Sequence, residues 1–366
     1  MAESISANRG DLAEAVLGAA VTARFWLRPE GATVSNQDIK KVLESVIRTN
    51  PVKFKRDDLQ LTAKITDTIT FKVGIPQKAY DFIKQKANWE LIPELFRSST
   101  AYVNSDRRLI LQSKFLSKNL KVNNILVNAD GTGDQTGTKA DIKLEVDGKP
   151  LAQQISLKVK GGDQFAQVGG LGFDKQLEIW QRLGVDVNPK RSEFEKLYDQ
   201  IDNKIRFADR NAAAKSKEAS LARQAAAVSY KFAAQQLSQK LKRGDEKTIM
   251  ALAEFIDKGA TYGDKSIELV KLVGGSYVRA KFGKQFLQNM KDVAPKLEIV
   301  FRGTTADPTV VIYHKEIGSG KAGKLIQVRA RYSGESAKNK QGKYYRVYLR
   351  NIVEAGDLMF KLATDR

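Results

Sequence analysis

The stretch ADIKLEVDGKP at residues 140–150, followed by ISLKVK at 155–160, determines the expected fold of this chain. Both ends of the stretch alternate apolar and polar residues, which is the pattern of β-strands with one buried face. The turn DGKP at 147–150 lies between the two alternating segments and is a hairpin signal. The sequence therefore predicts two neighbouring strands that pair antiparallel.

The alternation also predicts which side chains share a face of these strands. The polar face of the pair is expected to present Asp141, Lys143, Glu145, Ser156, Lys158 and Lys160. If the turn joins the two strands as an antiparallel pair, Asp141 and Lys158 can lie within reach of one metal-bound water. A carboxylate can hold Mg²⁺ against a phosphodiester, and a nearby ammonium can help generate hydroxide or stabilise developing charge. This pairing is typical of phosphodiester hydrolysis.

The rest of the chain is expected to form an α/β fold with helical and strand-rich additions. Helical patterns cover 9–25, 35–48, 76–87, 89–99, 189–242, 245–258 and 283–292, and another begins near Phe173. Strand patterns cover 59–73, 297–301, 309–314, 324–332 and 343–351. We predict three regions: an α/β core at 1–185, a basic helical region at 186–295 and a basic strand-rich region at 296–366.

Three short segments give the chain a resemblance to a known family. They are RGDLAEAVLGAA with Glu14, GTKADIKLEVDG with Asp141, and Ser156-Leu157-Lys158 at the end of the following strand. In this order they resemble the PD-(D/E)-x-K nuclease superfamily, whose core is that of the type II restriction endonucleases. The resemblance covers roughly residues 9–180 and implies a restriction-endonuclease-like mixed-sheet core flanked by helices.

The resemblance implies a role for each matching residue. Asp141 becomes the principal ligand of Mg²⁺, with Mn²⁺ as the alternative ion, and Lys158 becomes the catalytic lysine. Glu14 becomes an accessory ligand or an orienting acid, and the main-chain carbonyl of Leu157 faces the metal. These roles define a magnesium-dependent deoxyribonuclease.

The sequence departs from the family pattern at Ser156, which stands where the second acid is expected. A serine hydroxyl is a weak, neutral ligand, so either another carboxylate completes the charge around the ion or the ion binds more weakly than in the usual site. Glu145 and Glu14 are the candidates. The segment GGDQFAQVGG at 161–170 follows directly, and the resemblance places Gln164 beside the site, where it can orient water or phosphate.

Charge supports a nucleic-acid partner. The chain has 62 Lys and Arg against 42 Asp and Glu, a net charge of +20. Residues 1–200 hold 30 basic and 25 acidic groups, whereas residues 201–366 hold 32 and 17. Such a surplus favours binding to a polyanion, most commonly nucleic acid, although a basic surface can also serve solubility or an acidic protein partner.

Alternation in the last strands predicts where DNA is contacted. Guanidinium groups pair with phosphates or guanine edges, and interleaved tyrosines pack on sugars or bases. The residues expected to contact DNA are Lys160, Arg329, Arg331, Tyr344, Arg346 and Arg350.

Composition excludes several other classes of protein. The absence of cysteine rules out disulfides and thiolate chemistry, and a single histidine, His314, rules out zinc sites that need two imidazoles. No apolar run approaches the roughly 20 residues of a membrane span. We therefore expect a cytoplasmic protein, or one of the host cytoplasm if it is viral. The segment GSGKAGKL at 318–325 has the glycine and lysine spacing of a P-loop, but Leu325 stands where the hydroxyl residue that binds Mg²⁺ is needed. Because it also lies between two predicted strands, we expect a basic hairpin loop there.

The sequence as a whole predicts a divalent-metal-dependent DNA endonuclease. Cleavage of both strands by a core with one site requires two copies, so a homodimer is expected on mechanistic grounds. The alternative is a non-catalytic nucleic-acid-binding or viral assembly protein on a degenerate nuclease core. A third reading keeps the core and changes the substrate to RNA or branched DNA.

Overall fold

The protein has a mixed α/β fold, seen in a computed structural model that divides into two compact units. The structure describes residues 9–54, 58–119, 121–130, 140–151, 154–159, 164–169, 172–202, 204–261, 267–273, 275–303, 307–332, 335–339 and 342–364. Unit 1 contains residues 1–162 and 264–280, and unit 2 contains 163–263 and 281–366. The predicted helical and strand-rich regions thus belong mainly to one unit, and a later segment returns to the core.

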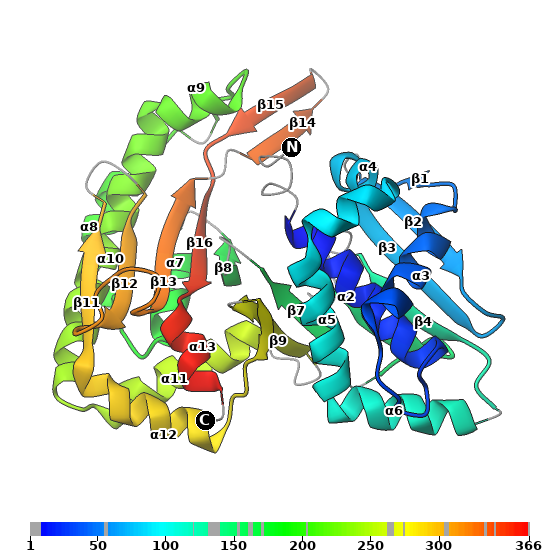
Figure 1. Ribbon diagram of the computed structural model, residues 1–366. Coiled ribbons are helices and arrows are strands. Elements are labelled where there is room, and N and C mark those ends of the chain that lie inside the picture. Colours follow the sequence, from blue (N-terminus) through cyan, green and yellow to red (C-terminus); the bar gives the residue numbers. More distant parts are fainter. Residues whose placement is uncertain are drawn as a thin grey trace. The chain divides into compact units, whose positions relative to one another are not determined.

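Unit 1 contains two sheets (Figure 1). The larger has the order β1 (Val52–Lys53), β2 (Asp58–Lys64), β3 (Ile69–Pro76), β4 (Ile125–Ala129), β5 (Lys143–Val146) and β6 (Lys149–Pro150). Only β3 and β4 pair parallel in it. The smaller has the order β10 (Ser276–Arg279), β9 (Ile267–Val273) and β7 (Gln154–Lys158), with β7 and β9 parallel.

The hairpin predicted at 147–150 is present, but it joins β5 to β6 and not to β7. Asp147 and Gly148 have φ values of 49° and 77°, the left-handed pair that a two-residue turn of this kind requires. The segment predicted as one strand at 59–73 is likewise a hairpin, formed by β2 and β3. Both differences arise because period-two alternation does not mark where a strand reverses.

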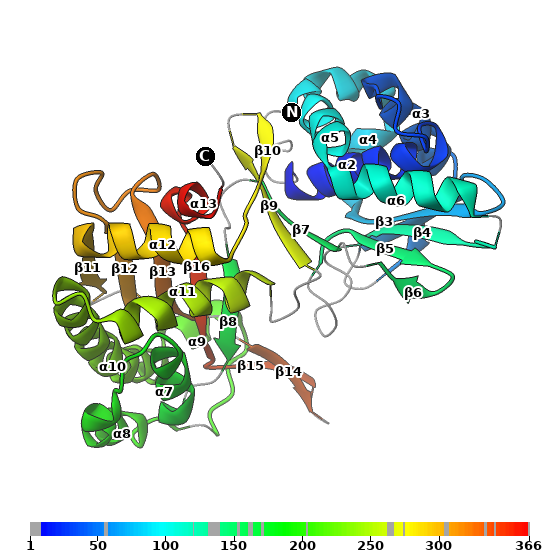
Figure 2. The ribbon, with the colours of Figure 1, turned by 90° about the horizontal axis from the view of Figure 1, so that it is seen from below.

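The helices of unit 1 begin with α2 (Arg9–Trp26), which was predicted from its apolar spacing. Almost every residue from Leu12 to Phe25 is buried, so α2 is an internal helix and not a surface one. It lies across β3 and β4 and contacts the neighbouring helices (Figure 2). The others are α3 (Asn36–Ile47), α4 (Gln77–Lys84), the 3-10 turn η2 (Lys86–Leu91), α5 (Pro93–Ser105) and α6 (Arg107–Lys118).

Gly18 allows α2 to approach the sheet closely. A Cβ atom at this position would lie 2.8 Å from Cβ of Ala129 on β4 and 2.9 Å from Cε2 of Phe71 on β3. Glu14 precedes Gly18 by one helical turn and therefore lies on the same face of α2. The close approach at Gly18 thus determines how near the Glu14 carboxyl comes to the sheet.

Replacing Gly18 by Ala is expected to lower the free energy of unfolding by about 1–3 kcal/mol, because the added methyl overpacks a rigid contact. The matched control is Gly10→Ala in the same helix, where a Cβ would meet no atom within 4 Å. There the better helix propensity of Ala should leave stability unchanged or raise it. Thermal unfolding of both variants measures the difference, and an equal response at the two glycines would contradict this account.

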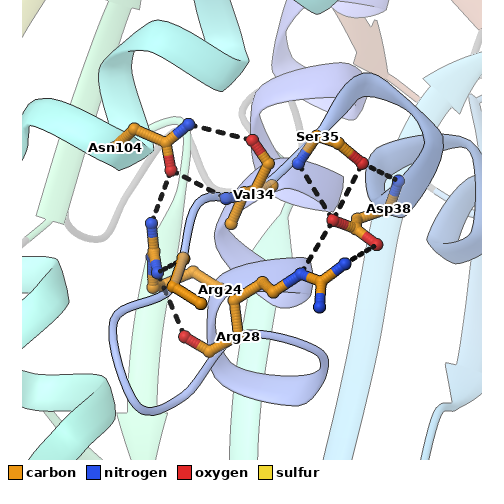
Figure 3. Close-up of polar contacts among 7 residues, drawn as sticks. Arg24, Arg28, Val34, Ser35, Asp38 and Asn104 are labelled. Atoms are coloured by element: carbon orange, nitrogen blue, oxygen red, sulfur yellow. Dashed lines mark hydrogen bonds and ion pairs between the residues drawn. The ribbon is translucent and has the colours of Figure 1, made fainter.

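Arg24 links the end of α2 to the segment before α3 and to α5 (Figure 3). Its side chain is fully buried, and burial lowers the pKa of its guanidinium. Asn104 Oδ1 accepts from Arg24 at 2.6 Å and from the Val34 amide at 2.9 Å. The guanidinium also donates to the carbonyls of Arg28, Ala32 and Val103. Beside it, Arg28 pairs with Asp38, which closes a capping box with Ser35 as predicted for the start of α3.

A second polar cluster anchors β9 and β10. Glu268 on β9 lies 2.9 Å from Arg279 on β10 and 2.5 Å from Arg108 on α6. Arg279 also pairs with Asp106, the residue that caps α6. Asp106 and Glu268 are both buried, so their charges require these partners. The cluster fixes the late segment 267–279 to the helices of unit 1.

Unit 2 is built on an antiparallel sheet. The strand order is β11 (Leu297–Arg302), β12 (Thr309–His314), β13 (Lys324–Tyr332), β16 (Leu349–Ala355) and β8 (Gln164–Gly169). β14 (Glu335–Asn339) and β15 (Gly342–Arg346) form a separate hairpin. The helices are α7 (Phe173–Arg182), α8 (Arg191–Tyr198), α9 (Arg210–Lys215), α10 (Lys217–Lys242), α11 (Glu246–Thr261), α12 (Lys284–Val293) and α13 (Asp357–Ala363).

Most predicted elements of unit 2 are confirmed, but the helical pattern predicted at 189–242 is divided into α8, α9 and α10. The long helix α10 ends before Gly244, which has a φ of 68°, and Asp245 accepts from the Thr248 amide at the start of α11. The strand predicted at 343–351 is wrong, because the chain leaves the strand at Val347 and Tyr348 and enters a different sheet as β16. Among the described residues, no helix is long and apolar enough to cross a membrane.

Candidate active site

The candidate site lies where β7 separates from β5, next to the bridge between Ile142 and Ile155. We call this place the strand fork. The two strands meet at a single bridge between Ile142 and Ile155, and β7 then pairs with β9. Beyond the bridge, β5 no longer pairs with β7. The Leu157 amide there donates to Asp141 Oδ2 at 2.5 Å. The Asp141 amide donates to the Ile155 carbonyl at 2.7 Å. Asp141 therefore makes hydrogen bonds to the main chain of both Ile155 and Leu157, and these bonds hold its carboxyl in place.

Lys158 and Ser156 contact the same carboxylate oxygen. Ser156 Oγ donates to Asp141 Oδ2 at 3.3 Å, and Lys158 Nζ lies 3.8 Å from it. The side chains of Asp141 and Lys158 are each only 15% exposed, so their attraction is weakly screened. Burial raises the pKa of Asp141, and the nearby Lys158 opposes this rise. The structure thus brings Asp141 and Lys158 together, as the strand pattern predicted.

Glu14 on α2 belongs to the same electrostatic cluster. Burial raises its pKa well above the usual range, and the negative charges of Asp141 and Asp11 raise it further. Lys158 acts in the opposite direction. The carboxyls of Glu14 and Asp141 disfavour each other's ionisation, and the Lys158 ammonium lies beside them. A cation bound between the two carboxyls would favour the charged form of both.

Sequence analysis missed Asp130, which follows β4 directly. Asp130 is 8% exposed, and its Oδ1 is buried without a hydrogen-bond partner among the described residues. Its charge also raises the pKa of Glu14. A Cβ at Gly74 on β3 would lie 3.1 Å from Asp130 Cβ, so Asp130 packs closely against the main chain of β3. The signal available in the sequence was an acid directly after an apolar strand.

Sequence analysis also missed Lys271, because no strand was predicted at 267–273. Lys271 on β9 stands directly opposite Lys158 on β7 in the parallel register, and it is 2% exposed. Neighbouring strands lie about 4.8 Å apart, so both lysines are on one side of the small sheet. A lysine within the apolar run IELVKLV was the only local signal.

Glu145, another predicted site residue, is not brought to the fork. Glu145 pairs with Leu126 and Pro150, four residues from Asp141, and four residues of strand span about 13 Å. Gln164 lies on β8 of unit 2, where it pairs with Glu354. Lys160 lies outside the described residues.

The carboxylates at the fork fit a hard divalent cation whose remaining ligands are water and substrate phosphate. Glu14 and Asp141 supply carboxylate oxygens, the ligands that Mg²⁺ prefers. In the part of the chain that the structure describes, no group of three or more acids or histidines is arranged to hold a metal ion. Mg²⁺ is commonly held by one or two carboxylates, with water and substrate phosphate completing the shell, so two acids suffice.

The predicted DNA-contact residues other than Lys160 lie in unit 2 in three settings. Arg329 on β13 forms an ion pair with Glu354 at 2.7 Å. Arg331 on β13 stands opposite Arg350 on β16, and like charges in that position repel unless an anion lies between them. Tyr344 and Arg346 are on β15.

Comparison of the chain with models of protein families, with curated proteins and with solved structures found no match in any of the three. Its function has to be inferred from the residues and contacts at the fork and on the basic surface of unit 2.

Proposed function

We propose that the protein is a divalent-metal-dependent DNA endonuclease with a restriction-endonuclease-like core in unit 1. The observation that carries the proposal is the Asp141 and Lys158 pair at the strand fork, only 3.8 Å apart and largely buried. The buried carboxyl of Glu14 and the unpaired oxygen of Asp130 lie in the same electrostatic cluster. Perturbed carboxyls around a lysine are a physical signature of catalytic sites, although structural ion pairs produce it too.

In this proposal, Asp141 and Glu14 hold Mg²⁺ or Mn²⁺. When bound, the ion neutralises charge on the scissile phosphate and favours the ionised form of the attacking water. Lys158 positions that water or a phosphate oxygen with its ammonium, which Asp141 holds in place. Ser156 orients Asp141 through its hydroxyl and adds no charge.

Asp130 is proposed to take the place of the family's second acid, at whose position Ser156 stands. Its unpaired Oδ1 can accept a hydrogen bond from water within the ion's coordination shell, a role that requires no direct contact with the ion. This assignment takes the role that sequence analysis gave to Glu145.

The experiment that tests the proposal is incubation of the full chain with supercoiled plasmid in Mg²⁺, in Mn²⁺ and in chelator. We expect nicked or linear DNA with either ion and none in chelator. Cleavage of both strands at one place would support a homodimer, which gel filtration with DNA can check. Metal-independent cleavage, or no cleavage of plasmid, single-stranded DNA, branched DNA or RNA, would contradict the proposal.

One observation favours the second candidate, a non-catalytic nucleic-acid-binding or assembly protein. The family's second acid is replaced by Ser156, whose hydroxyl already bonds to Asp141. Such a protein would bind DNA with the salt dependence of a basic surface and leave the plasmid intact.

A further inference from the structure

A small pocket in unit 2 is lined by aromatic rings and lies beside the basic strands. It occupies about 250 Å³ between the segment after α8 and the link from β15 to β16. Its walls include Tyr198, Asp202, Ile205, Phe207, Arg346 and Tyr348. The two walls are held together by main-chain hydrogen bonds between Phe207 and Tyr345, of 2.9 and 2.8 Å. We call it the Tyr348 pocket.

The aromatic and aliphatic side chains of the Tyr348 pocket are partly open to solvent. Tyr198, Phe207 and Tyr348 are half-buried, so part of each residue remains accessible. Ile205 is 36% exposed, which leaves an aliphatic side chain in water at the rim. Rings with accessible surface beside an exposed aliphatic group favour a flat, largely apolar ligand.

Cationic side chains lie close to the ring of Tyr348 in the pocket and to that of Tyr344, which precedes the lining residue Arg346 on β15. The Arg350 guanidinium lies 5.5 Å from the ring centroid of Tyr348, and that of Arg206 lies 4.8 Å from the centroid of Tyr344. Arg346 is exposed at the pocket itself. A flat apolar group that carries negative charge outside its ring matches this arrangement, and a nucleotide has that composition.

The size and polarity of the pocket limit the ligand further. A pocket of about 250 Å³ has room for one base. Asp202 is exposed at the pocket, and a carboxylate there can accept a hydrogen bond from the exocyclic amino group of a base. A base inside a duplex is stacked on both sides and cannot enter, so the ligand must be unpaired.

We propose that the Tyr348 pocket binds one unpaired base of a DNA strand, with Tyr348 as a stacking surface and Arg346 near its phosphate. This inference deepens the proposed function, since it names the feature of DNA that unit 2 recognises. It does not depend on the chemistry at the strand fork, because both the endonuclease and the non-catalytic candidate would bind DNA.

The test compares three DNAs of one sequence by fluorescence anisotropy: a fully paired duplex, the same duplex with one bulged base, and the single strand. Chelator is present throughout, so the comparison is independent of cleavage. We expect the full chain to bind the bulged duplex about 5- to 150-fold more tightly than the paired one, the range that stacking of one base supplies. Equal affinity for the bulged and paired duplexes would overturn the proposal.

Variants separate stacking from charge. Tyr348→Ala should abolish the preference for the bulged duplex and leave paired-duplex affinity within about twofold. Tyr348→Phe should retain the preference, because stacking needs the ring and not the hydroxyl. Ile205→Asp, at an exposed rim position, should also abolish the preference. Met250→Asp is its matched control, because Met250 is 42% exposed in the same unit and the change adds the same charge. A preference that survives both Tyr348→Ala and Ile205→Asp would place the bulge-binding site elsewhere.

Discussion

Asp141→Asn is expected to reduce plasmid cleavage by about a thousandfold or more while DNA binding remains intact. The amide keeps the size of the side chain but removes the charge that holds the metal ion and pairs with Lys158. A loss of this size corresponds to about 4 kcal/mol of transition-state stabilisation, within the range attributed to metal ions and charged groups in active sites. The rate is measured with supercoiled plasmid at saturating Mg²⁺.

Lys158→Ala is the companion variant, with an expected loss of about 10²- to 10³-fold, the loss typical of removing one stabilising donor. Asp67→Asn is the matched control, because Asp67 is fully exposed in the turn between β2 and β3 of the same unit. Binding of the paired duplex at several salt concentrations should be the same for all four proteins. Cleavage retained by either Asp141→Asn or Lys158→Ala would refute the assignment of the site.

Glu14→Gln is expected to abolish efficient cleavage and to stabilise the metal-free protein at neutral pH. In the unfolded chain this carboxyl loses its proton near pH 4.3, about the ordinary value for Glu. In the folded protein burial and the charges of Asp141 and Asp11 raise its pKa well above the usual range. The unfolded state therefore releases the proton first, and the folded state loses stability as pH rises through the raised pKa of Glu14.

Glutamine carries no charge, so the variant avoids this loss. Its melting temperature should equal that of the wild type below the ordinary pKa of Glu and exceed it by about 2–4 °C at high pH, if removal of the charge contributes about 1 kcal/mol. Glu44→Gln is the control of opposite sign, because the hydrogen bond from Lys86 lowers the pKa of Glu44. A Glu14→Gln melting temperature below the wild type across the pH range would show that Glu14 has a structural partner.

The same raised pKa predicts how cleavage depends on pH. Glu14 must release its proton before it can hold a cation, so the apparent affinity for Mg²⁺ should rise with pH as Glu14 ionises. Cleavage at subsaturating Mg²⁺ should rise in parallel, and excess Mg²⁺ should shift the profile to lower pH. An unchanged profile at low and high Mg²⁺ would separate Glu14 from metal binding.

The parts of the fold that local sequence determines were predictable. The turn at 147–150 predicted a hairpin, because turns depend on a few adjacent residues. The chemistry of Asp141 and Lys158 followed from alternation together with a family pattern.

Non-local pairings were not predictable from the sequence. β7 leaves β5 after one bridge because β9 offers it a parallel partner, and no local pattern near Ile155 indicates that choice. Lys271 could not be placed beside Lys158 without that pairing. Asp130 was overlooked because its importance depends on its burial and its unpaired oxygen, which only the packing of α2 and β3 determines.

The pairing of β7 with β9 has a consequence for biosynthesis. Ile267 follows Lys158 by about 110 residues, and most of the intervening chain belongs to unit 2. At about 5–20 residues per second, a ribosome needs roughly 5–20 s to produce this interval. During that time the nascent chain holds β7 with one edge unpaired and without Lys271. The edge beside Lys158 is therefore completed only after much of unit 2 has been translated, so a ribosome that stalls within the intervening segment leaves that edge open.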